Sequence, residues 1–214
     1  MRIETLKVAG IEEALHGMRN PMNSWHLADT KDDVIGENDL GLAQRLIKAG
    51  SEHCKFMRMI QVWADMDMTR FFHAEFDTYK FNTKNSCSTI HKLINPKNEI
   101  TLDMFKYYTE DEPIMTLIVE QLNKIREQFL NSNNAEEKRV LKRRAKTLLP
   151  EGFLQLRTVN TNYAELRNIV TQRRLHQMKE DWQDTFCKWV TTLPYAKELI
   201  FCGMEDEYNR LSNL

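Results

Sequence analysis

The sequence predicts a helix-rich α+β fold, on three observations. The 214 residues include eleven Met but only seven Gly and five Pro, and this composition favours helices. Apolar residues recur at spacings of three and four in several segments, whereas only a few short segments have the pattern of a strand. No stretch rich in Pro, Gly and Ser divides the chain, so we expect one domain over residues 1–214.

The first fifty residues predict a short strand and two helices. Apolar residues are spaced as in a strand over residues 2–8, and as in a helix over residues 11–18. A second helix has Asn38 or Asp39 as its N-cap and ends before Gly50, which suits a left-handed residue after a helix.

The next segment leads into an unusually polar run. Residues 53–64 gather apolar side chains, which favours a buried strand, with a buried helix as the alternative, and residues 65–67 would then turn the chain. Residues 68–79 have aromatic side chains at helical spacing. The polar run at residues 82–89 follows, and no Gly or Pro occurs from residue 69 to residue 93. We interpret this run as a loop shaped to hold a polar ligand, with a surface connection as the alternative.

Beyond residue 91 the patterns are mostly helical. We expect helices over residues 101–107, from Glu112-Pro113 onward, over 135–149, 161–175 and 179–193, and an extended segment at 153–158. The second of these helices has the clearest apolar stripe, formed by Ile114, Leu117, Ile118, Gln121, Leu122, Ile125 and Phe129. The third has six cations in nine residues, which indicates a solvated face or, as the alternative, a phosphate site.

Charge and cysteine usage exclude several classes of protein. The net charge is -1, so we expect no bulk binding of nucleic acid, and an anionic ligand would need a local site. The four Cys form no C-x-x-C pair and the six His form no metal-type doublet, so we expect no metal and reduced thiols in the cytoplasm. No signal sequence and no apolar run of membrane-spanning length is present, so we expect no membrane association.

A second polar group follows residue 160. Asn162 and Arg173 are eleven residues apart on a predicted helix, so at 100 degrees per residue their directions differ by about 20 degrees. A guanidinium fork matches phosphate, and an amide can both donate and accept, as a pyrimidine edge requires. The pair could serve one extended ligand, with a salt bridge to a neighbouring helix as the alternative for Arg173.

With both polar groups in view, the chain resembles the flavin-dependent thymidylate synthases of the ThyX type. Their signature RHRxxSxNxxS, placed without a gap on residues 78–88, matches T-Y-K-F-N-T-K-N-S-C-S. The signature's second Arg, its Ser, its Asn and its last Ser fall on Lys80, Thr83, Asn85 and Ser88. Outside the signature, family positions fall on Thr69-Arg70, Glu75, His53, Asn162 and Arg173, so the resemblance spans about residues 40–195.

The resemblance implies a mixed α/β fold with a small central sheet flanked by long helices, in a homotetramer whose sites combine several subunits. It implies nucleotide contacts from Arg70, Glu75, Lys80, Thr83, Asn85, Ser88 and Arg173, and cofactor contacts from His53, Tyr79, Asn162 and Asn168. FAD would reduce a methylene group that methylenetetrahydrofolate delivers to C5 of a pyrimidine deoxynucleotide, with no protein nucleophile.

The departures from the signature point to a changed ligand. Thr78 and Tyr79 replace the first Arg and the His, and Lys80 replaces a bidentate fork by a point charge. Glu75 stands where the family has Gln. Its carboxylate disfavours dUMP in the family's pose unless Glu75 pairs with Lys80 or Arg70, or unless the base can donate, as cytosine does.

Three hypotheses follow for the function. The first is flavin-dependent methyl or hydroxymethyl transfer to a pyrimidine nucleotide, in a bacterium or a phage-infected cell. The second is a non-catalytic protein that has lost flavin and holds or sequesters a mononucleotide, a dinucleotide or a cyclic signalling nucleotide, as a virus could against a host defence. The third is a structural or partner-binding helical protein. We also expect self-association, on the apolar surface that Trp182, Trp189 and the Met57–Met68 run would offer.

Overall fold

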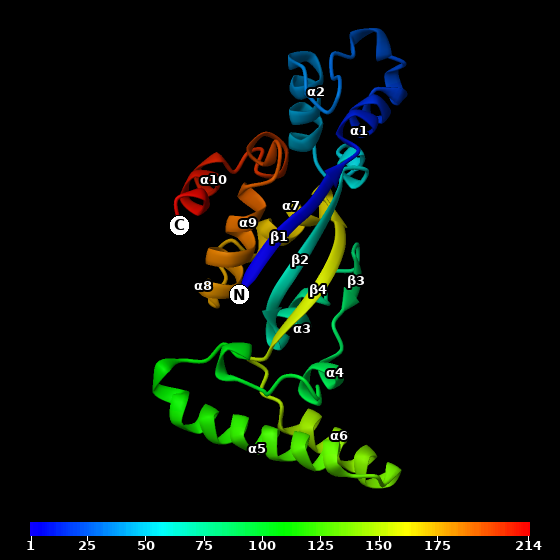
Figure 1. The fold of residues 1–214 in the computed structure, drawn as a ribbon. Helices are drawn as coiled ribbons and strands as arrows, with labels where there is room; N and C mark the ends of the chain where they lie inside the picture. Colours follow the sequence, from blue (N-terminus) through cyan, green and yellow to red (C-terminus); the bar gives the residue numbers. More distant parts are fainter. The chain divides into compact units, whose positions relative to one another are not determined.

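The computed structural model describes residues 1–214 and has one four-stranded sheet (Figure 1). The strands are β1 (Arg2–Ala9), β2 (Gln61–Thr69), β3 (Thr83–Ser86) and β4 (Leu154–Asn162), in the order β1-β2-β4-β3. The sheet is antiparallel, and the remaining elements are helices. The predicted helix-rich α+β fold with a small sheet is therefore confirmed.

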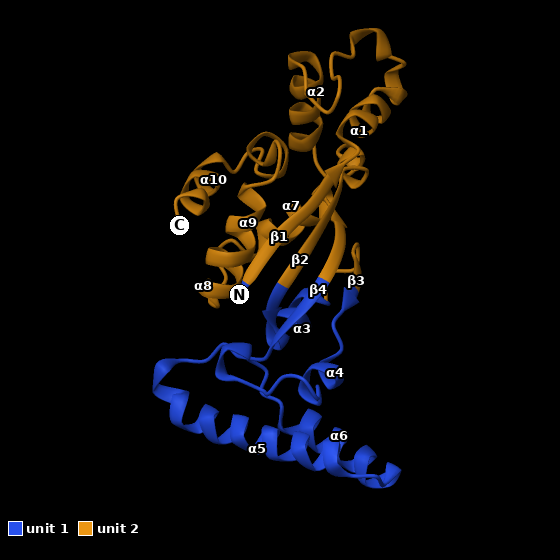
Figure 2. Ribbon diagram, in the orientation of Figure 1, with its two compact units in different colours: residues 1, 67–77, 85–157 blue, residues 2–66, 78–84, 158–214 orange.

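The chain forms two compact units (Figure 2). Unit 1 contains residues 1, 67–77 and 85–157, and unit 2 contains residues 2–66, 78–84 and 158–214. Strands β2, β3 and β4 each begin in one unit and end in the other. The single domain that we expected stays a prediction.

Unit 1 is built on two long helices that lie side by side (Figure 1). Its helices are α3 (Arg70–Phe76), α4 (Thr89–Leu93), α5 (Glu112–Asn131) and α6 (Ala135–Leu148). Asn134 caps α6, because its Oδ1 accepts from the backbone N–H groups of Glu136 and Glu137 at 2.9 and 3.2 Å. Leu122 and Ile125 of the predicted α5 stripe are buried, but Ile114 and Leu117 are 59% and 64% exposed. The core face of α5 instead includes Met115 and Val119, so the predicted stripe is wrong at its first two positions.

Unit 2 contains the remaining helices and most of the apolar core. The helices of unit 2 are α1 (Ile11–Met18), α2 (Glu37–Lys48), α7 (Tyr163–Arg173), α8 (Lys179–Asp181), α9 (Lys188–Thr191) and α10 (Glu205–Ser212). Two π-helical turns lie at Trp182–Cys187 and Ala196–Ile200. Short 3-10 turns lie at Asn20–Met22, Trp25–Leu27 and Lys55–Arg58. The apolar residues Tyr163, Leu166, Ile169 and Val170 of α7 are buried, as their helical spacing predicts.

Several predicted boundaries are wrong around β2. The strand begins at Gln61 rather than at residue 53, because Lys55–Arg58 is a 3-10 turn. Residues 65–67 do not turn the chain but continue the strand to Thr69. The physical reason is that side chains of a strand alternate between its two faces. Ala64, Met66 and Met68 are buried on one face, whereas Asp65 and Asp67 lie on the less buried face.

Two further predicted segments differ from the structure. Residues 82–89 are not one loop, because Thr83–Ser86 form β3 and Ser88 caps α4. This strand neighbours β4, and the ladder hydrogen bonds stabilise it without an apolar pattern of its own. Residues 101–107 form only a 3-10 turn at Leu102–Met104 rather than a helix, and a second 3-10 turn, Thr109–Asp111, precedes α5.

Both Trp residues and most apolar residues of the Met57–Met68 run are buried within the chain, but Met59 is 49% exposed. Trp182, Met57, Met66 and Met68 have no exposed surface, and Trp189 is also buried. The buried residues supply no surplus apolar surface, and self-association and the homotetramer stay predictions. No helix of the structure has the length and apolar character needed to cross a bilayer.

Candidate functional site

A small polar pocket of about 310 Å³ lies in unit 2 at the ends of β2 and β4. We name it the amide pocket, because four amide side chains line it together with one cation and two hydroxyls; its residues are Gln61, Lys80, Phe81, Asn82, Thr83, Asn160, Thr161 and Asn162. The structure thus brings together three of the predicted site residues, Lys80, Thr83 and Asn162.

The amides of this pocket are only partly satisfied by the chain. Asn160 Nδ2 donates to Gln61 Oε1 at 3.3 Å and to the carbonyl of Val62 at 3.4 Å. Asn82 Nδ2 donates to the carbonyl of Tyr79 at 2.9 Å, and this bond fixes which end of the amide is the acceptor. Asn82 Oδ1 is buried and accepts no hydrogen bond. A buried acceptor without a partner costs free energy, so a ligand that donates to it would be favoured.

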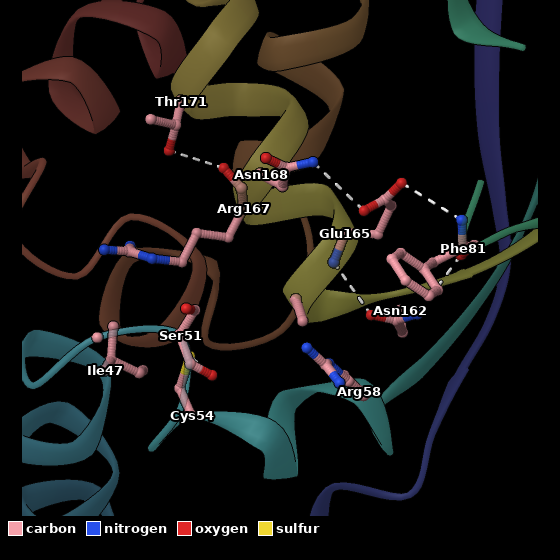
Figure 3. Close-up of a pocket in the computed structure, with 12 residues that line it drawn as sticks. Ile47, Ser51, Cys54, Arg58, Phe81, Asn162, Glu165, Arg167, Asn168 and Thr171 are labelled. Carbon is pink, nitrogen blue, oxygen red and sulfur yellow. Dashed lines mark hydrogen bonds between the residues drawn. The ribbon is translucent and has the colours of Figure 1, made fainter. Parts of the chain in front are cut away.

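A second cavity of about 440 Å³ lies along one face of α7 (Figure 3). We name it the α7 cavity; its residues are Ile47, Gly50, Ser51, Cys54, Arg58, Phe81, Asn162, Ala164, Glu165, Arg167, Asn168 and Thr171. Phe81 and Asn162 line both spaces, so the amide pocket and the α7 cavity adjoin at these two residues.

The first turn of α7 arranges the polar groups of this cavity. Asn162 caps the helix, since its Oδ1 accepts from the backbone N–H of Glu165 at 3.0 Å. The carboxylate of Glu165 lies between Phe81 and Asn168 (Figure 3) and accepts from the Phe81 backbone N–H and from Asn168 Nδ2, each at 3.4 Å. Asn162 and Asn168, two predicted cofactor contacts, therefore share one cavity with a buried carboxylate.

Arg173 lies at the other end of α7 and lines neither space. Its Nε donates to the hydroxyl of Tyr79 at 2.9 Å, and its guanidinium centre is 4.5 Å from the ring centre of Trp182. The Tyr79 hydroxyl in turn donates to Gln172 Oε1 at 3.1 Å. The predicted helix begins later than expected, because Asn162 ends β4 and is the N-cap of α7, and the structure does not bring Asn162 and Arg173 to one pocket.

The remaining predicted nucleotide contacts lie in unit 1. Arg70 donates to the carbonyl of Leu149 at 3.3 Å and pairs with Glu151 at 3.2 Å. Glu75 is half-buried on α3, and Asn85 is exposed on β3. Ser88 caps α4 by accepting from the backbone N–H of His91 at 3.4 Å.

His53 lies apart from the other predicted flavin contacts of unit 2. It lines a third cavity of about 470 Å³ with Met18, Phe56 and Met59, whereas Asn162 and Asn168 line the α7 cavity. Tyr79 is buried and lines none of these three cavities. The four predicted cofactor contacts thus line no common cavity, and their role stays a prediction.

Sequence reasoning missed four residues that the α7 cavity contains: Arg58, Phe81, Glu165 and Arg167. A signal for Glu165 was available, because Asn at an N-cap followed three residues later by Glu is a capping-box pattern. No local signal pointed to the others, since long-range packing decides what faces a cavity.

The fold is that of the flavin-dependent thymidylate synthases. Two solved structures of ThyX from Helicobacter pylori with FAD and dUMP are similar to this chain over nearly its whole length. The first is 20% identical with a TM-score of 0.71 and covers 97% of this chain and 99% of its own. The second is 20% identical with a TM-score of 0.69, and the match covers 94% and 98% of the two chains. No family model and no curated protein sequence matches the chain. The resemblance seen in the sequence is thereby confirmed for the fold.

Proposed function

We propose that this protein binds a nucleotide and that the amide pocket is part of the binding site. The observation that carries the proposal is the composition of that pocket: one cation, two hydroxyls and four amides, with one buried amide oxygen left without a donor. Lys80 supplies the point charge that a phosphate needs, and the amides supply both donors and acceptors for a base and a sugar.

The first candidate activity is flavin-dependent transfer of a methyl or hydroxymethyl group to C5 of a pyrimidine deoxynucleotide. The likeness of the fold to the ThyX structures with FAD and dUMP supports it. Bound FAD would supply the reducing chemistry, and methylenetetrahydrofolate would supply the carbon. The chain's own residues would bind and orient the nucleotide. The predicted cofactor contacts line no common cavity of one chain, which supports a flavin site completed by other copies of the chain.

The second candidate is nucleotide binding without flavin, for storage, regulation or sequestration. The position of Tyr79 favours it, because this residue stands where the family's signature has His. Its ring is buried, and its hydroxyl is bonded to Gln172 and Arg173. A side chain used in this way stabilises unit 2 and is not exposed to a cofactor.

Lys80→Ala should weaken nucleotide binding by roughly ten- to a hundredfold, the usual worth of one charge-assisted hydrogen bond to phosphate. Isothermal titration calorimetry against a panel of mononucleotides, dinucleotides and cyclic nucleotides measures this, with Thr83→Ala, at another residue of the amide pocket, as a second variant. Lys146→Ala is the matched control, because Lys146 is exposed on α6 in unit 1. No binding at micromolar concentration, or unchanged affinity in both variants, would contradict the proposal.

A titration with FAD separates the two candidates. The enzyme candidate predicts that flavin absorbance comigrates with the protein on gel filtration, and that added dUMP or dCMP perturbs the flavin spectrum. A colourless protein fraction after incubation with excess FAD, together with nucleotide binding by calorimetry, would establish the second candidate and remove the first.

A further inference from the structure

Phe81 stands at the junction of the amide pocket and the α7 cavity. Its side chain is 66% exposed, and the guanidinium of Arg58 lies over its ring at 5.9 Å. Its backbone is held at both ends: the N–H donates to Glu165, and the carbonyl accepts from Thr161 Oγ1 at 3.4 Å and Asn162 Nδ2 at 3.5 Å. An exposed aromatic ring on an anchored backbone is suited to stack on a planar heterocycle.

Phe81 shares each of its two spaces with an acceptor, Glu165 in the α7 cavity and Asn82 in the amide pocket, and both acceptors favour a ligand that donates hydrogen bonds. Glu165 is only 5% exposed, and its two hydrogen bonds are both long, at 3.4 Å. A carboxylate offers about four acceptor positions, so Glu165 can accept further hydrogen bonds from a ligand. The buried Oδ1 of Asn82 accepts no hydrogen bond.

The cations of the α7 cavity do not neutralise this carboxylate by direct bonding. Arg167 Nη1 donates to the carbonyls of Ile200 and Cys202 at 2.7 and 2.9 Å, and Arg58 lies over Phe81. Glu165 receives its hydrogen bonds from neutral amides instead. A neutral N–H donor on a ligand therefore has a charged acceptor to bind, and hydrogen bonds to a charged group are roughly twice as strong as neutral ones.

This arrangement distinguishes bases by their donors. Cytosine, adenine and guanine carry an exocyclic amino group, whereas uracil and thymine carry carbonyl oxygens and a single ring N–H. A carboxylate accepts from an amino group and repels a carbonyl oxygen placed in the same position.

We propose that Phe81 stacks on the base of the bound nucleotide and that Glu165 selects a base with an exocyclic amino group over uracil and thymine. This inference rests on the nucleotide binding proposed above and adds to it the class of base. It rests on cavity residues of this chain rather than on the ligand of the similar ThyX structures.

Calorimetry with dCMP, dAMP, dGMP, dUMP and dTMP tests the inference on the wild-type chain. We expect at least one amino-bearing nucleotide to bind about ten- to a hundredfold more tightly than dUMP or dTMP. This is the discrimination typical of one well-placed hydrogen-bonded pair of side chain and base. Comparing the affinity for dCMP with the affinities for dAMP and dGMP shows whether the site binds a pyrimidine or a purine.

Glu165→Gln should reduce that preference to about one, because the amide can donate to a carbonyl oxygen as well as accept. Glu13→Gln, an exposed change on α1, is the control that should keep the preference. Phe81→Ala should weaken the binding of all five nucleotides alike, by about tenfold, because the stacking contact is lost. Circular dichroism verifies that each variant is folded, and the wild-type preference stands as a test even if Glu165→Gln does not fold.

The outcomes separate this inference from the proposed function. Binding of dUMP or dTMP as tight as that of every amino-bearing nucleotide would overturn the selection while leaving nucleotide binding intact. An unchanged preference in folded Glu165→Gln would overturn the role of Glu165. Absence of binding for all five nucleotides would overturn the inference, whereas the proposed function would be overturned only if the dinucleotides and cyclic nucleotides of the larger panel also failed to bind.

Discussion

Asp39→Ala should destabilise the protein by about 3–5 kcal/mol, because it leaves the buried Arg19 guanidinium without its partner. Arg19 and Asp39 are 3% and 1% exposed, and Arg19 Nε lies 2.5 Å from Asp39 Oδ1. The other carboxylate oxygen accepts from the backbone N–H groups of Asp29 and Thr30 and from Thr30 Oγ1 at 3.1, 2.9 and 2.6 Å. One side chain thus joins the end of α1, the following loop and the start of α2.

Urea denaturation measures the change in the free energy of unfolding. Glu136→Ala is the control, since Glu136 pairs with Arg139 in an ion pair whose members are both exposed, and this change should leave the urea midpoint almost unmoved. Equal midpoints for the two variants would show that the buried pair contributes no more than an exposed one.

The same carboxylate makes stability depend on pH. Burial acts to raise the pKa of Asp39, but hydrogen bonds from Thr30, from Arg19 and from backbone amides outweigh it and hold this pKa below its ordinary value. A lowered native pKa means that the stabilisation is present above the unfolded-state pKa, about 4, and is lost as pH falls through the native value. The acid-induced loss of stability should therefore be smaller in Asp39→Asn than in the wild type.

The helices were predictable because their apolar residues follow a period of 3.6 regardless of what packs on them. Two segments show this, since apolar side chains at helical spacing are buried in both: Leu166 and Ile169 in α7, and Trp182 and Phe186 in the segment 179–193. The predicted stripe of α5 was wrong at Ile114 and Leu117, because an apolar residue at the edge of a stripe is buried only if a neighbouring element covers it.

The strands were harder to predict, because a strand depends on its partners. Asp65 and Asp67 resemble a turn when taken alone, and only their alternation with buried Ala64 and Met66 marks them as strand residues. Strand β3 has no apolar alternation at all, and the sequence of Thr83–Ser86 gives no reason to expect a sheet edge.

The candidate site was predictable in part, through the family signature. Lys80, Thr83 and Asn162 line one pocket, although 82 residues separate Lys80 from Asn162 in the sequence. Glu165 and Phe81 were missed because their contact joins two segments that no local pattern relates.

Trp182→Ala should destabilise the protein by about 3–5 kcal/mol, the range for removing a large aromatic side chain from a core. The indole has no exposed surface, and its ring centre lies 5.5 Å from Phe186, 5.9 Å from His176 and 6.3 Å from Tyr79. The guanidinium of Arg173 lies over it at 4.5 Å, so the ring also contributes a cation–π contact. Urea denaturation followed by far-UV circular dichroism measures the loss without depending on the fluorescence of the removed residue.

Trp182→Phe separates the two contributions of the ring. Phe retains an aromatic face for Arg173 but fills less of the core, so we expect a smaller loss of stability than with Ala. Trp25→Ala is the matched control, because Trp25 is 42% exposed and its indole N–H donates only to Asn20 Oδ1 at 2.9 Å. If Trp182→Ala lowered the free energy of unfolding no more than Trp25→Ala, the ring would not be the centre of the packing that holds Tyr79 and Arg173 together. If Trp182→Phe instead matched Trp182→Ala, the core would require the full shape of the indole, and the aromatic face that Phe keeps for Arg173 would contribute nothing measurable.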